Sequence, residues 1–361
     1  MTKTTAHHRV VGQDGAETGR TRRHPGETRG LAGPRAEKTV SLALQGGGAH
    51  GAFTWGVLDA LLEDGRIAVD AITGASAGAL NAVVMVEGWL EGGLDGARHQ
   101  LETFWRRASL DGSVPPSHRF LLNRMLGLWG TVARNFGPYE ANPLNINPLR
   151  DTLDALIDFN RVRECTDVEI FISATNVWTG KVAIFTRQEL TADHLMASAC
   201  LPTVFQAVEL DGVPYWDGGY MGNPALFPLF DKTMTDDIVL VQIDPLERRQ
   251  TPRTEREIRN RINEITFNSN LLRELRAVAF VKRLIAEGKL SSDEYKNVHL
   301  HRIDGSGVLD DYQASSRLNA EWDFFVRLRD AGRRTARSWL AAHYPAIGTR
   351  STIDLQAAAL G

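Results

Sequence analysis

Short apolar runs without polar alternation dominate this chain. They span residues 39–45, 70–74, 168–174, 182–186, 238–243 and 298–303, and segments with helical spacing of apolar residues lie between several of them. A strand that is buried on both faces has this pattern, because its successive side chains meet a covering helix on either side. The runs therefore predict an α/β fold with a mostly parallel central sheet and helices outside it.

A glycine triplet follows the first of these runs. The residues GGGAHG, which begin at Gly46, match G-x-G-x-x-G, the pattern of a dinucleotide-binding loop. Such a site also needs an acidic residue about 20 positions further on, at the carboxyl end of the next strand. Asp70 has about that spacing, but it precedes the next predicted strand. We therefore expect no NAD or FAD and interpret the loop as a site for another small negative charge.

The next apolar run leads into the sequence GASAG, residues 74–78. This is G-x-S-x-G between a strand and a helix, the arrangement known as a nucleophile elbow. The turn leaves room only for small neighbours, which gives Gly74 and Gly78 a steric role. The Ser76 hydroxyl then lies at a helix N-terminus, where the backbone dipole favours a developing negative charge. We predict that Ser76 is a nucleophile and that its oxyanion is held by the backbone N–H groups of Gly46, Gly47, Gly48 and Ala77.

A base for this serine is predicted far downstream, in VPYWDGGYMGNPAL, residues 213–226. Standing alone, the Asp-Gly-Gly sequence at 217–219 would be an ordinary turn signal. The Ala-Ser-x-x-x-Pro element at 197–202 and the Asn-Pro pair at 223–224 change that interpretation. Together with the glycine triplet and the G-x-S-x-G motif, these features resemble the patatin-like phospholipase family over about residues 39–245.

The resemblance implies a three-layer α/β/α core and a lipid acyl hydrolase of the phospholipase A, lysophospholipase or esterase type. It implies a Ser76–Asp217 dyad without histidine, a lipid ester as substrate, and neither a metal nor an organic cofactor. Asp217 would accept the hydroxyl proton while Ser76 attacks the ester carbonyl, and water would then release the fatty acid from the acyl-enzyme.

One position departs from the family pattern. Family loops often carry Arg or Lys two positions after the third glycine, where this chain has His50. A neutral histidine contributes a weaker field at the oxyanion, and an unperturbed pKa of ~6.5 would make it a modulator that renders activity pH-sensitive. The alternative is a residue that is hydrogen-bonded locally at the start of a helix.

Two other functions remain open from the sequence. One is an α/β-hydrolase-like esterase, whose order of serine, acid and histidine is matched by Ser76, Asp217 and His301 or His299. Only one predicted strand precedes the strand that leads to Ser76, which argues against an α/β-hydrolase. Both histidines are equally consistent with structural residues on one strand face. The other is a catalytically idle protein that binds lipid or acyl groups in the same groove.

The remaining segments give weaker expectations. Residues 1–38 carry eight basic and four acidic side chains and predict a disordered basic tail. The net charge of −3 favours no nucleic-acid partner, and the two cysteines, Cys165 and Cys200, are expected to be buried thiols. With no apolar run near the ~18 residues that span a membrane, we expect a cytoplasmic protein with peripheral membrane contact. The sequence leaves the oligomeric state open.

The C-terminal part predicts a helical extension over 246–345 that packs on a core of 39–245, followed by a tail at 346–361. A helix over 255–287 has Ile258, Ile262, Ile265, Leu272, Leu275 and Ala279 at helical spacing. Either this stripe packs on the domain, or a basic amphipathic face rests on anionic lipid. A second helix is predicted over about 313–342. The apolar region at 104–146 is expected to pack in the core or to form a lid over the acyl-chain groove.

Overall fold

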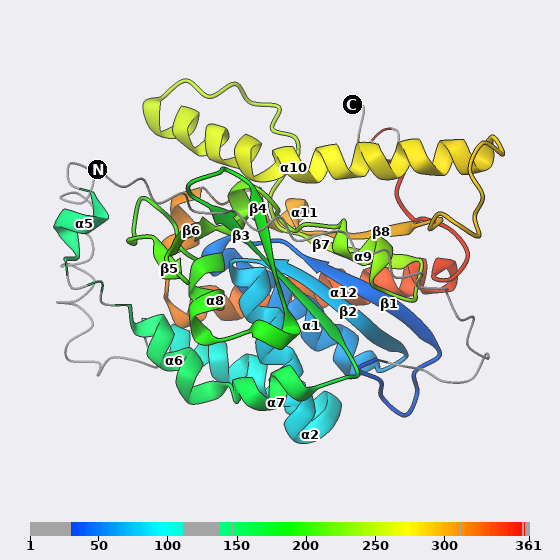
Figure 1. Cartoon of the computed structure of the whole chain (residues 1–361), viewed down its shortest axis with the longest axis horizontal. Helices are drawn as coiled ribbons and strands as arrows, with labels where there is room; N and C mark the ends of the chain where they lie inside the picture. Colours follow the sequence, from blue (N-terminus) through cyan, green and yellow to red (C-terminus); the bar gives the residue numbers. More distant parts are fainter. Residues whose placement is uncertain are drawn as a thin grey trace, which may run out of the picture.

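The computed structural model of the chain describes residues 30–110, 137–143, 145, 147–310, 312, 314–355 and 357. In this part of the chain the centre is an eight-stranded sheet with the order β5-β6-β3-β2-β1-β7-β8, and β4 pairs with β3 outside that order (Figure 1). The contiguous strands β3, β2, β1, β7 and β8 are parallel, whereas β4, β5 and β6 pair antiparallel. The strands are β1 (Lys38–Leu44), β2 (Ile67–Ala75), β3 (Glu169–Asn176), β4 (Val182–Thr186), β5 (Val208–Leu210), β6 (Val213–Asp217), β7 (Asp237–Gln242) and β8 (His299–Asp304).

Helices cover both faces of this sheet, so the α/β class and the three-layer architecture are confirmed. One face carries α1 (Gly51–Asp64), α2 (Ala77–Ala108, interrupted at Gly92 and Gly93) and α12 (Trp322–His343), together with α6 (Pro148–Leu156), α7 (Phe159–Glu164) and α8 (Ala192–Ser198). The other face carries α10 (Glu255–Ala286) and α9 (Pro228–Asp231) (Figure 1). Two short helices, α5 (Pro138–Ala141) and α11 (Ser306–Leu309), lie in connections. Each face has its own apolar core, because the strands between them are buried on both sides.

All six apolar runs of the sequence form strands, with ends that differ by a few residues. The sequence analysis did not predict β5 and β6. Their side chains are mostly half-buried, and β6 contains Pro214 and exposed Trp216. An outer strand of this kind lacks the continuous apolar run that identified the inner ones.

The C-terminal part is more than a helical extension on a finished core. Its strand β8 joins the sheet beside β7, while α10 and α12 cover opposite faces. The segment predicted as a tail also packs: Ile347 and Leu355 are buried, and the Thr352 N–H donates to the Leu300 carbonyl at 3.1 Å. At the other end, residues 1–29 lie outside the described part, and buried Leu31 pairs with Val69 of β2.

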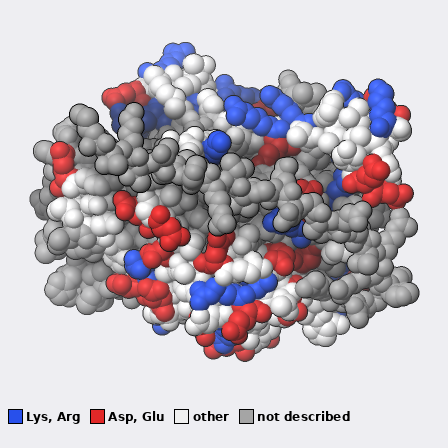
Figure 2. Space-filling model, viewed as in Figure 1, with Lys and Arg blue, Asp and Glu red and all other residues white. Residues whose placement is uncertain are grey.

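Helix α10 does not pack as its sequence pattern suggested. The first three isoleucines of the expected stripe, Ile258, Ile262 and Ile265, are 44%, 57% and 54% exposed. The helix instead buries Phe267, Leu271, Leu275 and Val278 against the sheet. The expected stripe was wrong because it joined residues from two different helix faces. Figure 2 shows Lys and Arg side chains gathered along the edge of the molecule that α10 occupies in Figure 1.

Other expectations have mixed outcomes. Cys165 and Cys200 are buried free thiols, as predicted. The region considered as core or lid lies largely outside the described residues, from 111 to 136. Among the helices that the structure describes, none is both long and apolar enough to cross a membrane.

Candidate functional site

Ser76 lies at the sharp junction between β2 and α2. Its backbone has φ 51° and ψ −125°, a conformation that costs a non-glycine residue energy and is typical of strained functional turns. A Cβ on Gly74 would approach the Ala79 nitrogen to 2.8 Å, and one on Gly78 would approach the Leu44 carbonyl oxygen to 2.2 Å. Both elbow glycines therefore have the predicted steric role.

A buried serine that the sequence analysis gave no role holds this elbow in place. The Ser198 hydroxyl accepts the N–H of Ser76 at 2.9 Å and donates to the Ser173 carbonyl at 2.8 Å. Ser198 belongs to the Ala-Ser-x-x-x-Pro element, so its motif was visible in the sequence. Its role was not, because α8 reaches the elbow only through the tertiary fold.

Asp217 ends β6 and is fully buried. Its Oδ1 accepts the Gly219 N–H at 2.7 Å, while Oδ2 has no hydrogen-bond partner of good geometry among the described residues. A Cβ on Gly218 would lie 2.1 Å from the Ser173 carbonyl oxygen, and one on Gly219 would lie 2.2 Å from the Phe267 ring. The Asp-Gly-Gly sequence thus places a carboxylate in a tight pocket with one oxygen uncommitted.

The environment of Asp217 raises its pKa to about 6. Burial raises the pKa, and the hydrogen bond from Gly219, the Ser76 hydroxyl and the charge of Arg317 each lower it; the charge of Asp244 raises it further. The Ser76 side chain is therefore a direct neighbour of the carboxyl group. Two residues 141 positions apart (217 minus 76) meet at one point. A carboxylate with a pKa in this range is ionised at neutral pH and is more basic than an exposed one.

The glycine triplet borders Ser76 on its other side. A Cβ on Gly46 would lie 2.7 Å from the Ser76 Cβ, so only glycine permits this approach. Gly48 has φ +58°, and a Cβ there would lie 2.5 Å from the Arg317 carbonyl oxygen. The Gly46 N–H donates to Asn223 Oδ1 at 2.7 Å and is therefore occupied. In the described part of the chain, nothing accepts a hydrogen bond from the N–H groups of Gly47, Gly48 or Ala77.

A buried polar network fixes this loop. Gln45 is fully buried, and its Oε1 accepts the N–H groups of Ile243 and Asp244 at 2.8 and 2.9 Å. Its Nε2 donates to Asn268 Oδ1 of α10 at 3.1 Å. Asn223, which holds Gly46, donates at 3.4 Å to Asp244 Oδ2.

The Asp244 carboxylate also forms an ion pair with Arg317 of the short helix η4 (Ala314–Leu318). The sequence analysis assigned no role to Gln45, Asp244 or Arg317. Only the position of Gln45, directly before the glycine triplet, gave a signal.

His50 is placed differently from the expectation. It is 3% exposed, its Nε2 lies 2.7 Å from the Ser316 hydroxyl, and its ring packs near Tyr312 and Phe324. Burial and the nearby charges of Arg317 and Arg248 lower the pKa of His50 to about 3. His50 is therefore neutral near neutral pH, and the expected pH sensitivity does not follow from it. The positive charge beside the glycine loop comes from Arg317.

The two histidines of β8 do not join the Ser76 and Asp217 pair. His301 Nε2 is 2.8 Å from Asp237 Oδ1, and its Nδ1 is 3.2 Å from the Thr352 hydroxyl. His299 Nδ1 lies 3.6 Å from the other oxygen of Asp237. Asp237 begins β7, whereas the glycine loop and Ser76 follow the carboxyl ends of their strands. The geometry does not support a Ser76-Asp217-His301 triad.

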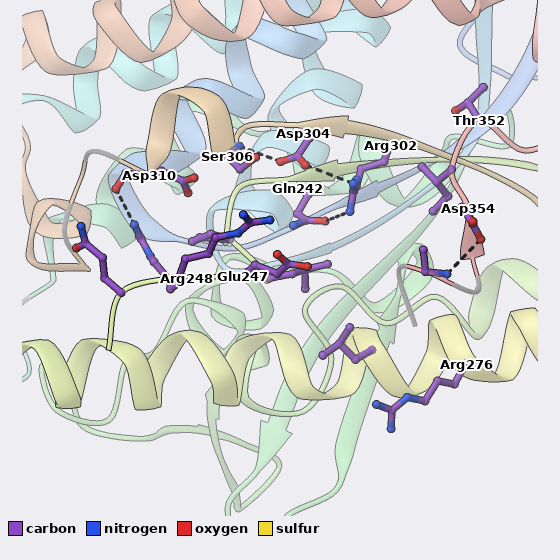
Figure 3. Close-up of a pocket in the computed structure, with 17 residues that line it drawn as sticks. Gln242, Glu247, Arg248, Arg276, Arg302, Asp304, Ser306, Asp310, Thr352 and Asp354 are labelled. Carbon is purple, nitrogen blue, oxygen red and sulfur yellow. Dashed lines mark hydrogen bonds and ion pairs between the residues drawn. The ribbon is translucent and has the colours of Figure 1, made fainter. Parts of the chain in front are cut away.

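A cavity of about 1100 Å³ opens elsewhere, between α10, β8 and the C-terminal segment (Figure 3). Its wall is polar and largely self-paired: Arg302 contacts Gln242 and Asp304, and Arg248 contacts the Asp310 carbonyl. Neither Ser76 nor Asp217 lines it. No group of three or more His, Cys, Asp or Glu suited to a metal ion occurs among the described residues.

The chain is similar to two solved structures and to one protein family. Two solved structures share low identity with the chain. VipD from Legionella pneumophila is 14% identical with a TM-score of 0.41, covering 88% of this chain and 71% of VipD. The ExoU–SpcU complex from Pseudomonas aeruginosa is 17% identical with a TM-score of 0.31, covering 98% and 85%. No curated protein sequence is significantly similar to the chain. The model of the family described as patatin-like phospholipase matches residues 42–230, more than half of the chain, which therefore belongs to the patatin-like phospholipase family.

Proposed function

We propose that the protein is a serine hydrolase of fatty-acyl lipid esters in which Ser76 is the nucleophile and Asp217 the general base. The observation that carries the proposal is the pairing of a strained serine at a helix N-terminus with a buried carboxylate that has one oxygen uncommitted. Family membership supports the substrate class.

The proposed reaction begins when Asp217 takes the Ser76 hydroxyl proton and Ser76 Oγ attacks the ester carbonyl. The N–H groups of Gly47, Gly48 and Ala77 are the donors for the tetrahedral oxyanion, since Gly46 is held by Asn223. Preorganised donors of this kind contribute ~2.7–4 kcal/mol each where they have been removed singly. As the intermediate collapses to an acyl-enzyme, Asp217 passes the proton taken from Ser76 to the leaving alkoxide, which departs as the free alcohol. Asp217 then deprotonates the water molecule that releases the fatty acid, and the proton returns to Ser76 Oγ.

A fluorophosphonate probe tests the assignment, because it phosphonylates an activated serine. We expect stoichiometric labelling of the wild-type chain, none of Ser76→Ala, and labelling of Asp217→Asn slowed by on the order of a hundredfold or more. Ser198→Ala is the matched control for a neighbouring serine: it should still label, more slowly. Wild-type protein that does not label, and releases no fatty acid from phospholipids or lysophospholipids, would favour the idle lipid-binding alternative.

A further inference from the structure

Helix α10 has two apolar faces, and the fold covers one of them. Ile258, Ile262, Ile265, Leu272 and Phe280 follow one another at intervals that bring them to the same side of the helix. Four of them are large exposed side chains, with exposed fractions of 44% for Ile258, 57% for Ile262, 54% for Ile265 and 52% for Phe280. The opposite side of the helix packs against the sheet. We call the first set, with the arginines beside it, the outward face of α10.

Cations outnumber acids beside these apolar side chains, and the exposed acids at the two ends of the helix, Glu255 and Glu287, pair with Arg259 and Arg283. Arg276 and Arg283 fall on the same line, and Arg273 borders it with no ion pair to any described residue. Two acids of the helix point inward instead. Glu264 is buried and pairs with Arg248 and Arg261, and Glu274 accepts the N–H groups of Leu226 and Phe227 at 2.5 and 3.0 Å.

A cavity of about 290 Å³ opens directly beside the outward face. Its lining combines apolar Leu246, Ile265 and Leu272 with cationic Arg261, Arg273 and Arg276, and with Glu264, which pairs with Arg261. Apolar walls with several guanidinium groups suit the phosphate and first methylenes of a phospholipid. The cavity also touches Asn268, whose carbonyl oxygen accepts the Gln45 amide beside the glycine loop.

We propose that the outward face of α10 docks on an anionic phospholipid bilayer. A helix that mixes exposed aliphatic side chains with arginines suits the surface of an anionic bilayer, because the aliphatic groups enter the headgroup region while the guanidinium groups pair with lipid phosphates. The buried side of the same helix contacts the site, because Phe267 packs on Gly219 beside Asp217. Docking would therefore bring Ser76 to its substrate. The proposal rests on the proposed function only for the lipid nature of that substrate.

Vesicle flotation tests the docking with the full chain carrying Ser76→Ala, so that no lipid is hydrolysed. The vesicles contain either phosphatidylcholine alone or phosphatidylcholine with phosphatidylglycerol. We expect binding to the phosphatidylglycerol vesicles, and a loss on the order of tenfold in Ile262→Asn/Ile265→Asn. Arg273→Glu should weaken binding to the vesicles that contain phosphatidylglycerol and leave binding to pure phosphatidylcholine vesicles unchanged. The control is Met234→Asn, an equally exposed apolar side chain just before β7, which should bind as the parent does.

The same substitutions, made in the chain that keeps Ser76, separate the effect on membrane docking from the effect on catalysis. The isoleucine variant should hydrolyse a soluble short-chain nitrophenyl ester as the wild type does but lose activity on vesicle phospholipid. The proposal is overturned if the parent chain ignores phosphatidylglycerol vesicles, which would favour a protein partner for this face, or if neither the isoleucine variant nor Arg273→Glu changes binding. Vesicle binding without fluorophosphonate labelling would leave the docking intact and reject the proposed hydrolase.

Discussion

A single buried carboxyl group sets the reactivity of the proposed site. Burial raises the pKa of Asp217, and a protonated carboxyl group cannot act as a base. The Gly219 N–H, the Ser76 hydroxyl and the Arg317 charge oppose this effect and leave the pKa at about 6. The base is thus ionised at pH 7 yet has no hydrogen-bond partner of good geometry at Oδ2 to compete for the proton.

The first prediction follows from the direction of these effects. Because the ionised form is the active one, the rate of fluorophosphonate labelling should rise with pH to a plateau, with its midpoint at about pH 6. Arg317→Met removes a positive charge that lowers the pKa of Asp217, so the midpoint should move to higher pH. Labelling of this variant should be slow at pH 6 and recover at pH 8. The measurement is the rate of fluorophosphonate labelling over a series of pH values. Arg317→Lys should remain close to wild type.

His50 supplies the comparison for that experiment. Its pKa of about 3 leaves it neutral over the same pH range, so His50→Gln should keep the wild-type midpoint even if labelling is slower. A midpoint that moves with His50 and not with Arg317 would contradict the assignment of the local charge.

The sequence contains motifs for the residues of the proposed site but not for the residues that support them. Ser76, Asp217 and the glycines could be found because each needs particular neighbours in the chain, which a motif records. Arg317, Asp244 and Ser198 act through contacts between distant segments, and a lone arginine or serine has no such pattern. The hydrogen bond from the Gly46 N–H is another contact between distant segments that no motif records, since its acceptor is the side chain of Asn223.

At the scale of elements, the junction of β2 and α2 is the part that tolerates least change. Gly78, in the first turn of α2, lies against the carbonyl oxygen of Leu44 at the end of β1. Contact between the helix backbone and the neighbouring strand is what brings Ser76 beside the glycine loop. A side chain at this position would push the helix away from both.

We therefore expect Gly78→Ala to lower the free energy of unfolding by about 1–3 kcal/mol and to slow labelling of Ser76. In a helix interior this substitution normally stabilises, so a loss reports the clash and not helix propensity. Gly307→Ala in α11 is the control, because a Cβ there meets nothing within 4 Å. Chemical denaturation measures both, and equal unfolding free energies for the two variants would show that the close approach is absent.

Strand prediction succeeded wherever the sequence has an apolar run, half-buried β4 included, and failed for β5 and β6, which have none. Strand β7, for example, is buried at all of its positions. The short strand β6, which ends at Asp217, is half-exposed and was not predicted. In α10 the spacing predicted a helix correctly, but two apolar faces merged into one stripe because spacing alone does not tell which face the fold covers.

At the scale of the whole molecule, the last third of the described chain contributes residues that contact the proposed site. Arg317 lies in the connection between β8 and α12, and it contacts the glycine loop and Asp244. Helix α12 crosses α1 at backbone contact: a Cβ on Gly332 would lie 2.1 Å from the Phe53 carbonyl oxygen. Since α1 follows the glycine loop directly, the position of α12 is coupled to the loop through rigid elements.

This coupling predicts that damage at the α1–α12 crossing is felt at Ser76. Gly332→Ala should lower the melting temperature by several degrees, and loss of labelling on heating should coincide with loss of tryptophan fluorescence, because Trp339 of α12 is buried in the same core. Gly307→Ala in α11, where a Cβ meets nothing within 4 Å, should leave the melting temperature unchanged. If α12 instead packed as a separate unit, Gly332→Ala would shift the tryptophan signal first and labelling would persist beyond it. A single shared transition therefore requires that the C-terminal elements and the Ser76 elbow unfold together.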